Sequence, residues 1–107
     1  TIYNEKITHK DVRVLHKENN DDYFTCPWLC TIIVERDRFA LMEKLRNNHI
    51  ESAQVHYRND RYSVFGKRCK DFPNMDMLED KYLVLPLHHK VSTEDILKIC
   101  QTINSGW

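Results

Sequence analysis

The sequence is poor in glycine, in net charge and in long apolar runs, and each absence excludes a class of protein. Only two of its 107 residues are glycine, so it has no glycine-rich loop of the kind that holds phosphate groups. Sixteen basic residues balance sixteen acidic ones, which leaves no net charge to attract nucleic acid or an anionic membrane. The longest apolar runs, 29–34 and 82–87, are far too short to cross a bilayer. We therefore expect neither a nucleic-acid partner nor a membrane span.

The remaining composition is that of one ordinary globular domain. A chain of 107 residues is long enough to close a single hydrophobic core, and 41% hydrophobic with 30% charged residues is a usual balance. No secretory signal peptide is visible. The four cysteines are Cys26, Cys30, Cys69 and Cys100. Their spacing is a poor match to a zinc ribbon, so we predict free thiols in a reducing, cytoplasmic compartment and no metal site.

The first residues have a different character from the rest. The chain begins at Thr1 rather than at methionine, and residues 1–11 are polar without the turn chemistry that would start a domain. We interpret residues 1–11 as a connector left from a missing N-terminal domain. Residues 12–107 are then a single C-terminal domain.

Four segments carry strand patterns. Residues 12–17 alternate apolar and polar side chains, as a partly exposed strand does, and residues 18–22 have turn chemistry. Residues 29–34 are apolar on both faces and rich in β-branched residues, which is typical of a central strand covered on both sides. Residues 50–57 are expected to form a third strand, and residues 82–86 a fourth that a proline ends.

Helices are predicted over 37–48, 73–81 and 92–106. The last of these has the clearest signal, because Ser92 and Asp95 have the spacing of a capping box. The apolar stripe of the first helix is expected to contain Phe39, Leu41, Met42 and Leu45. Together the elements predict an α+β fold, a small three- to four-stranded, largely antiparallel sheet with helices packed on one face.

Residues 56–62 gather imidazole, phenol, guanidinium and carboxylate groups in one short loop. Arg58 and Arg61 are suited to hold a phosphate or carboxylate group, Arg58 by a two-pronged contact. Asn59 and Asp60 are suited to hydrogen-bond sugar hydroxyls, and the tyrosines to stack on a ring. The same residues also suit a solvated loop whose Asn-Asp pair makes the turn. Their spacing leaves both interpretations open.

Other signals have simple structural interpretations. His88 and His89 are adjacent, and neighbouring strand residues point to opposite faces, so a shared metal ion is disfavoured. Trp28, beside a proline, is expected to anchor the entrance of a strand, with a ligand-stacking role as the alternative. Residues 79–81 are interpreted as a solvated helix end. No Ser, Cys or Lys lies in a recognisable nucleophile setting, so the chain by itself shows no catalytic machinery.

A set of motifs in a fixed order resembles one family. The motifs are Trp28–Val34, Leu41–Leu45, His49–Ser52, Val55–Tyr57, Phe72–Pro73, Leu83–His88 and Val91–Ile96. No single motif is specific, but the order and the gaps between them are similar to those of the C-terminal small domain of DegT-type sugar aminotransferases. These are pyridoxal-phosphate enzymes of aspartate-aminotransferase-like fold, also called fold type I. The similarity covers about residues 12–103.

The resemblance implies an amino-group transfer, usually from glutamate, to a keto group on a nucleotide-linked sugar. In such enzymes a lysine and a carboxylate of the large N-terminal domain hold pyridoxal phosphate, which supplies the electron sink. The small domain closes one side of the cleft and offers a loop to the sugar nucleotide, and that loop matches residues 56–62 here. The implied substrate contacts are Arg58, Asn59, Tyr57, Asp60 and His56.

Two departures from the family limit what the resemblance implies. Many relatives have proline and a second histidine where this chain has Arg58–Arg61. None of the nine lysines stands in a setting similar to that of the cofactor-binding lysine. We therefore expect no catalytic and no cofactor-binding residue in this chain, which alone should not transaminate. The parent enzyme is expected to supply the large domain and to form a homodimer.

Two functions of other classes remain open at this level. One is a free-standing module that binds a small anionic ligand through Arg58 and Arg61. The other is a structural or interaction domain that docks a partner on the edge formed by residues 83–87.

Overall fold

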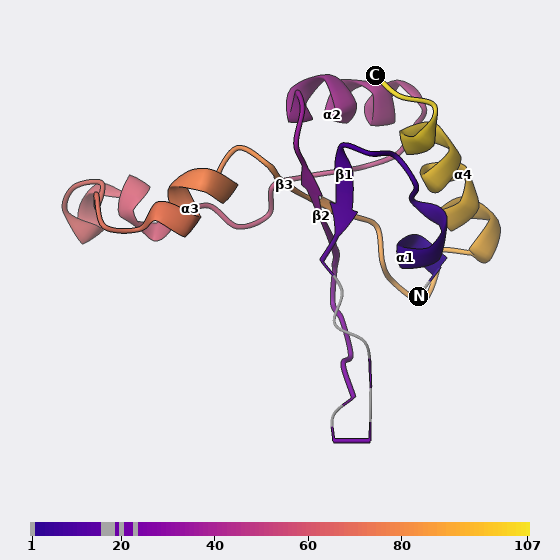
Figure 1. Cartoon of the computed structure of the whole chain (residues 1–107), viewed down its shortest axis with the longest axis horizontal. Coiled ribbons are helices and arrows are strands. Elements are labelled where there is room, and N and C mark those ends of the chain that lie inside the picture. The colour runs from indigo at the N-terminus through magenta and orange to yellow at the C-terminus, as the bar shows by residue number, and fades with distance from the viewer. Residues whose placement is uncertain (1, 16–18, 20, 23) are drawn as a thin grey trace.

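The computed structural model describes residues 2–15, 19, 21, 22 and 24–107, and a three-stranded antiparallel sheet lies at the centre of this part of the chain. The strands are β1 (Val12–Val14), β2 (Cys30–Val34) and β3 (Tyr82–Leu85), in the order β1-β2-β3. Helices α1 (Ile2–Lys6), α2 (Arg38–Asn47) and α4 (Thr93–Asn104) gather around the sheet, whereas α3 (Pro73–Leu78) lies apart from them on the other side (Figure 1). This arrangement confirms the predicted α+β class.

Strand β2 is the central strand, as its apolar sequence predicts. It pairs with β1 so that Ile32 lies opposite Val14, and with β3 so that Ile32 lies opposite Leu83. Ile32, Ile33 and Val34 are all almost fully buried, which means that both faces of this strand are covered. Because β2 pairs with β1 on one side and with β3 on the other, it fixes the position of both edge strands.

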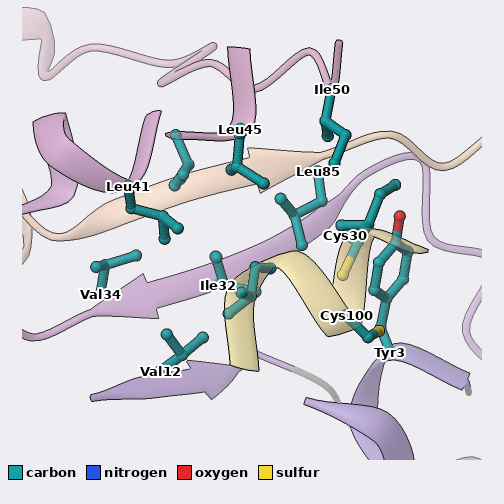
Figure 2. Packing of buried hydrophobic residues seen from close by; sticks show 13 residues of the cluster. Tyr3, Val12, Cys30, Ile32, Val34, Leu41, Leu45, Ile50, Leu85 and Cys100 are labelled. Carbon is teal, nitrogen blue, oxygen red and sulfur yellow. The ribbon is translucent and has the colours of Figure 1, made fainter. Parts of the chain in front are cut away.

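The hydrophobic core lies between the sheet and two long helices, α2 (Arg38–Asn47) and α4 (Thr93–Asn104) (Figure 2). Buried side chains of the cluster come from the sheet, from both helices and from the N-terminal segment. They include Tyr3, Ile32, Val34, Leu41, Leu45, Leu83, Leu85, Ile99, Cys100 and Ile103. This single cluster fits the expected one-domain core.

Both long helices begin with side-chain caps, and that of α4 is the predicted capping box. The Asp37 carboxylate accepts a hydrogen bond from the backbone N–H of Ala40, at 3.0 Å. At α4, the Ser92 hydroxyl accepts from the backbone N–H of Asp95, and the Asp95 carboxylate accepts from the backbone N–H of Ser92. These bonds satisfy backbone donors that have no partner within the helix.

The predicted strand over 50–57 is wrong. The segment meets the sheet only through one isolated bridge, in which Ala53 and Val84 exchange backbone hydrogen bonds of 3.4 and 2.9 Å. Beyond it the chain leaves β3, because Arg58 is held by ion pairs to the helix α3 (Pro73–Leu78) and its neighbours. Ion pairs of the Arg58 side chain, rather than backbone hydrogen bonds to β3, hold the end of this segment.

The helix near the N-terminus, α1, was not predicted. Residues 1–11, interpreted as a connector, contain α1 (Ile2–Lys6), whose Tyr3 is buried in the core and donates from its hydroxyl to the Pro86 carbonyl at 2.8 Å.

One residue of the apolar stripe predicted for α2 was assigned wrongly. Leu41 and Leu45 are buried, but Phe39 is 70% exposed. Phe39 lies at helical spacing from the exposed Glu43 and Arg46, on a different face of α2 from the buried Leu41 and Leu45.

Residues 56–80 form an arm that extends away from the core (Figure 1). The arm contains two short 3₁₀ helices, Asn59–Arg61 and Ser63–Phe65, followed by α3. On the β1 side, residues 16 and 17 of the predicted strand and residues 18 and 20 of the turn predicted over 18–22 lie outside the described residues.

Several further findings concern the described part of the chain. None of its helices is long and apolar enough to span a membrane. No group of three or more His, Cys, Asp or Glu side chains is placed there to hold a metal ion. All four cysteines are free, and Cys30 and Cys100 are buried in the core, as their apolar surroundings predict.

Replacing Leu45 by alanine is expected to destabilise the domain by about 2–5 kcal/mol, because it opens a cavity in the core between α2 and the sheet. Leu45 has no exposed surface. Urea denaturation followed by circular dichroism measures the change. Phe39→Ala, in the same helix but mostly exposed, is the control and should change the free energy of unfolding by no more than about 0.5 kcal/mol. Equal effects of the two substitutions would contradict the described core.

Candidate functional site

The five residues predicted to contact substrate line one open groove. The groove has a volume of about 640 Å³, within the range of about 300–1,000 Å³ usual for small-molecule sites. Residues from the loop, from the segment before α3, from α3 and from β3 form its walls. They are His56, Tyr57, Arg58, Asn59, Asp60, Phe65, Phe72, Met75 and Tyr82. The fold thus gathers the loop residues around one cavity with an aromatic lining.

Arg58 is the buried centre of this region. It is only 5% exposed, and its guanidinium bonds three carboxylates, those of Asp60, Asp76 and Glu79. The contact with Asp60 is two-pronged, from Nε to Oδ1 and from Nη2 to Oδ2, the latter at 2.7 Å. Nη2 also donates to the carbonyl of Cys69 at 3.4 Å. The guanidinium of Arg58 is therefore occupied by groups of the arm itself.

Asp60 extends the same cluster to another part of the arm. Its Oδ2 accepts from the backbone N–H of Cys69 at 2.7 Å, in addition to the bonds from Arg58. The hydrogen bonds from Arg58, helped by the one from Cys69, lower the pKa of the Asp60 carboxyl from 3.8 to about 2. The carboxylate is therefore ionised over the whole physiological pH range.

Glu79 connects the arm to the core. Its side chain accepts from Arg58, at 3.3 Å, and from Arg68, while its backbone carbonyl accepts from Arg38 Nη1 at 3.0 Å and from Gln54 Nε2 at 3.1 Å. Arg38 is itself buried at the start of α2 and also donates to the Tyr82 carbonyl at 3.1 Å. Residues 79–81 were interpreted as a solvated helix end. This is wrong for Glu79, because its carboxylate and its backbone carbonyl both accept hydrogen bonds.

The remaining loop residues have exposed side chains. His56, Tyr57 and Asn59 line the groove and are exposed at its surface. The Arg61 guanidinium lies over the ring of Tyr57, with 4.2 Å between its carbon Cζ and the ring centroid. Within the described residues Arg61 makes no ion pair, so its charge is available to a ligand beside Tyr57. The arrangement can bind an anion, stack on a ring and hydrogen-bond hydroxyl groups.

The described residues do not fit a pyridoxal-phosphate site. None of the lysines among them is buried, and Lys44 and Lys81 are bonded to Gly106 and Glu35, respectively. The residues that line the groove include no Ser, Cys or Lys.

Sequence reasoning missed the far walls of the groove and the partners of Arg58. Phe65, Phe72, Met75 and Tyr82 were not assigned to a site, and Asp76 and Glu79 lie 18 and 21 residues from Arg58. The one signal within the loop was Asp60, two residues from Arg58. A carboxylate so close to an arginine indicates an internal ion pair as well as a binding loop.

Replacing Arg58 by methionine is expected to loosen the arm without unfolding the core. The side chain keeps its apolar bulk, but Asp60 loses its cation, and Asp76 and Glu79 keep only Arg68. Hydrogen exchange of the Cys69 amide, which is bonded to Asp60, should speed up by roughly tenfold or more, while exchange in β2 stays slow. Arg61→Met, which removes a cation with no ion pair, is the control and should leave the Cys69 rate unchanged. An unchanged rate in Arg58→Met would show that the cluster does not hold the arm.

The low pKa of Asp60 gives a second prediction. A carboxyl whose pKa is lowered on folding stabilises the folded arm above its unfolded pKa of 3.8, and this stabilisation is lost as the pH falls toward 2. Carbon-detected NMR of the Asp60 carboxyl should give a midpoint near 2. In Arg58→Met the midpoint should rise toward 3.8, because the largest cause of the shift is gone. A midpoint near 3.8 in the unmutated chain would contradict the ion pair.

Comparison with known proteins gives a consistent result. The sequence profile of the DegT/DnrJ/EryC1/StrS aminotransferase family matches residues 1–104. A comparison with curated proteins finds no significant match.

Solved structures share the fold of the chain over nearly its whole length. The sugar aminotransferase CalS13 from Micromonospora echinospora is 30% identical and matches 99% of this chain with a TM-score of 0.84. AtS13 from Actinomadura melliaura, 24% identical, matches 99% with a TM-score of 0.86, and the aminotransferase TlmJ from Streptoalloteichus hindustanus, 15% identical, matches 96% with 0.84. The chain spans 28% of the length of each of these proteins. With its fold, its groove and the profile match over residues 1–104, the chain belongs to the DegT/DnrJ/EryC1/StrS aminotransferase family.

Proposed function

We propose that this chain is the small domain of a pyridoxal-phosphate-dependent aminotransferase that acts on a nucleotide-linked keto-sugar. The domain supplies a substrate-facing groove and no catalytic lysine. The observation that carries the proposal is the groove itself, in which the five loop residues lie together in a member of this family. Its volume and its mixture of aromatic and polar walls suit a ligand with both rings and hydroxyl groups.

Within the groove the loop residues divide into two roles. Arg58 and Asp60 are bonded to each other and to the arm, and this favours a positioning role for both. Tyr57, Asn59 and His56 are exposed to a ligand, Tyr57 for stacking and the other two for hydrogen bonds. The substrate contacts first assigned to Arg58 and Asp60 stay predictions, with less support than those of the exposed residues.

Arg61 is the cation best placed for the phosphates of the nucleotide. Its guanidinium is exposed, makes no ion pair within the described residues and is held over the ring of Tyr57. A planar guanidinium binds phosphate oxygens in pairs, which lysine cannot do. A phosphate bound there would lie beside the aromatic wall formed by Tyr57.

The rest of the reaction belongs to the parent enzyme. Pyridoxal phosphate supplies the electron sink in such enzymes, and we place its lysine and its carboxylate partner in a large domain outside this chain. Several apolar side chains of the arm are exposed, among them Val64 (82%) and Phe65 (64%). They are available for contact with that domain. A homodimeric parent is part of the same proposal.

The structure weakens the two alternatives from other classes. An anion-binding module needed both Arg58 and Arg61, and the charge of Arg58 is already occupied. A partner docked along residues 83–87 would need a free edge on β3, but Ala53 already pairs with Val84 there. A docking domain also leaves the groove at residues 56–60 unexplained.

Replacing Asn59 by alanine in the parent enzyme is expected to raise the KM for the sugar nucleotide by about tenfold, with little change in kcat. The reason is that one exposed hydrogen-bonding group is lost outside the reacting centre. Steady-state assays of glutamate-dependent amination measure the change. Asn47→Ala, at the exposed end of α2 and outside the groove, is the matched control. If KM is the same in Asn59→Ala and in the control, the groove does not face the substrate.

A further inference from the structure

A second groove lies beside the first, and the loop function does not account for it. It has a volume of about 270 Å³ and runs along the end of β3. Ala53, Val84 and Pro86 are among its apolar lining, and Glu51, Ser52 and His88 add polar groups. It is smaller than the range of about 300–1,000 Å³ for drug-sized ligands, so it has room for a single ring rather than for a whole nucleotide.

Trp28 lines this groove with an aromatic ring that folding does not require. The residue was expected to anchor a strand entrance, but it is 72% exposed, and this expectation is wrong. Within the described residues its indole N–H has no hydrogen-bond partner. In contrast, the indole N–H of Trp107 donates to the carbonyls of Arg36 and Asp37. An exposed ring of this size costs solvation free energy unless a ligand covers it.

The polar groups of the groove suit hydroxyl groups. The Nδ1 atom of His88 accepts a hydrogen bond from the backbone N–H of Lys90 at 3.2 Å, which places the proton of the neutral ring on Nε2. His88 is therefore a donor to a ligand. Glu51 makes no ion pair within the described residues, so its carboxylate is available as an acceptor, and the Ser52 hydroxyl can serve in either role.

We propose that this groove is a pyranose subsite in which the ring of one sugar stacks on Trp28. A pyranose has a face of C–H bonds and an edge of hydroxyl groups. The C–H face carries slight positive charge, which matches the negative face of the indole ring. The hydroxyl edge matches Glu51, Ser52 and His88. A nucleobase, flat on both sides, is better held between two large aromatic rings, and Trp28 is the only Trp, Tyr or Phe in the lining of this groove.

A contact between His56 and Trp28 links the two grooves. His56 lines the first groove, and its ring contacts Trp28 edge to face, with 6.1 Å between the ring centroids and 60° between the planes. A ligand made of two linked parts would place its sugar on Trp28 and its nucleotide in the larger groove. The subsite thus deepens the proposed function and rests on it for the attached nucleotide, but its sugar contact can be tested separately.

The test is a titration of the nitrogen-15-labelled chain followed by NMR of amide and indole N–H signals. The probes are methyl glucopyranoside, uridine and uridine diphosphate glucose. We expect the glycoside to shift the Trp28 indole signal and the Ser52 amide, with a dissociation constant on the order of 1 mM. Uridine should leave both in place, and the Trp107 indole, bonded inside the fold, should stay fixed in every titration.

Substitution of the indole ring gives an independent measurement. Trp28→Leu should abolish the shifts caused by the glycoside and weaken binding of uridine diphosphate glucose by about tenfold, as expected for loss of an aromatic contact. Phe24→Leu is the matched control, because Phe24 is 81% exposed and lines neither groove. It should leave both affinities unchanged.

The outcomes separate this inference from the proposed function. If uridine diphosphate glucose shifts the amides of residues 56–62 but the glycoside does not shift Trp28, the pyranose subsite is wrong and the proposed function stands. If uridine rather than the glycoside shifts Trp28, the groove holds a base and the inference is overturned. If the glycoside shifts Trp28 but the nucleotide sugar leaves residues 56–62 unchanged, the subsite stands and the proposed function fails.

Discussion

The geometry of the candidate site depends on the buried guanidinium of Arg58. Removing such a group from water is costly, and an arginine remains buried only if carboxylates and carbonyls replace the lost hydration. Asp60, Asp76 and Glu79 supply these partners from two parts of the arm, and Asp60 also bonds Cys69. All these partners are in place only when the loop and α3 lie side by side. The cluster therefore fixes one arrangement of the arm.

The core and the arm are held together by different forces. Around β2, buried apolar side chains from the sheet, α2 and α4 pack into one cluster. The arm has no such cluster, since Phe65, Phe72 and Met77 are all more than half exposed. Its order depends on directional contacts between charged groups instead. These contacts leave the aromatic side chains at the surface, where the groove can use them.

The sequence predicted most elements whose signals are local. The apolar run of β2 and the capping box at Ser92 and Asp95 depend on neighbouring residues, and both were located correctly. The strand over 50–57 failed because Arg58 and its distant partners draw that segment away from β3. The loop residues that line the groove were identified from their local chemistry. The buried state of Arg58 was not identified, because it depends on distant partners. Partners 18 and 21 residues away leave no pattern near the loop itself.

Attachment to the core is what makes the groove a preorganised surface. The carbonyl of Glu79 accepts from Arg38 at the start of α2 and from Gln54 next to the sheet bridge, while its carboxylate bonds Arg58. Any movement of the arm away from the sheet would break the contacts of Glu79 with Arg38 and Gln54 together. A ligand then meets side chains whose backbone is already fixed, so little free energy is spent on ordering the arm. His56 is under the same constraint, because residues 53–58 are tied to β3 at one end and to the ion cluster at the other.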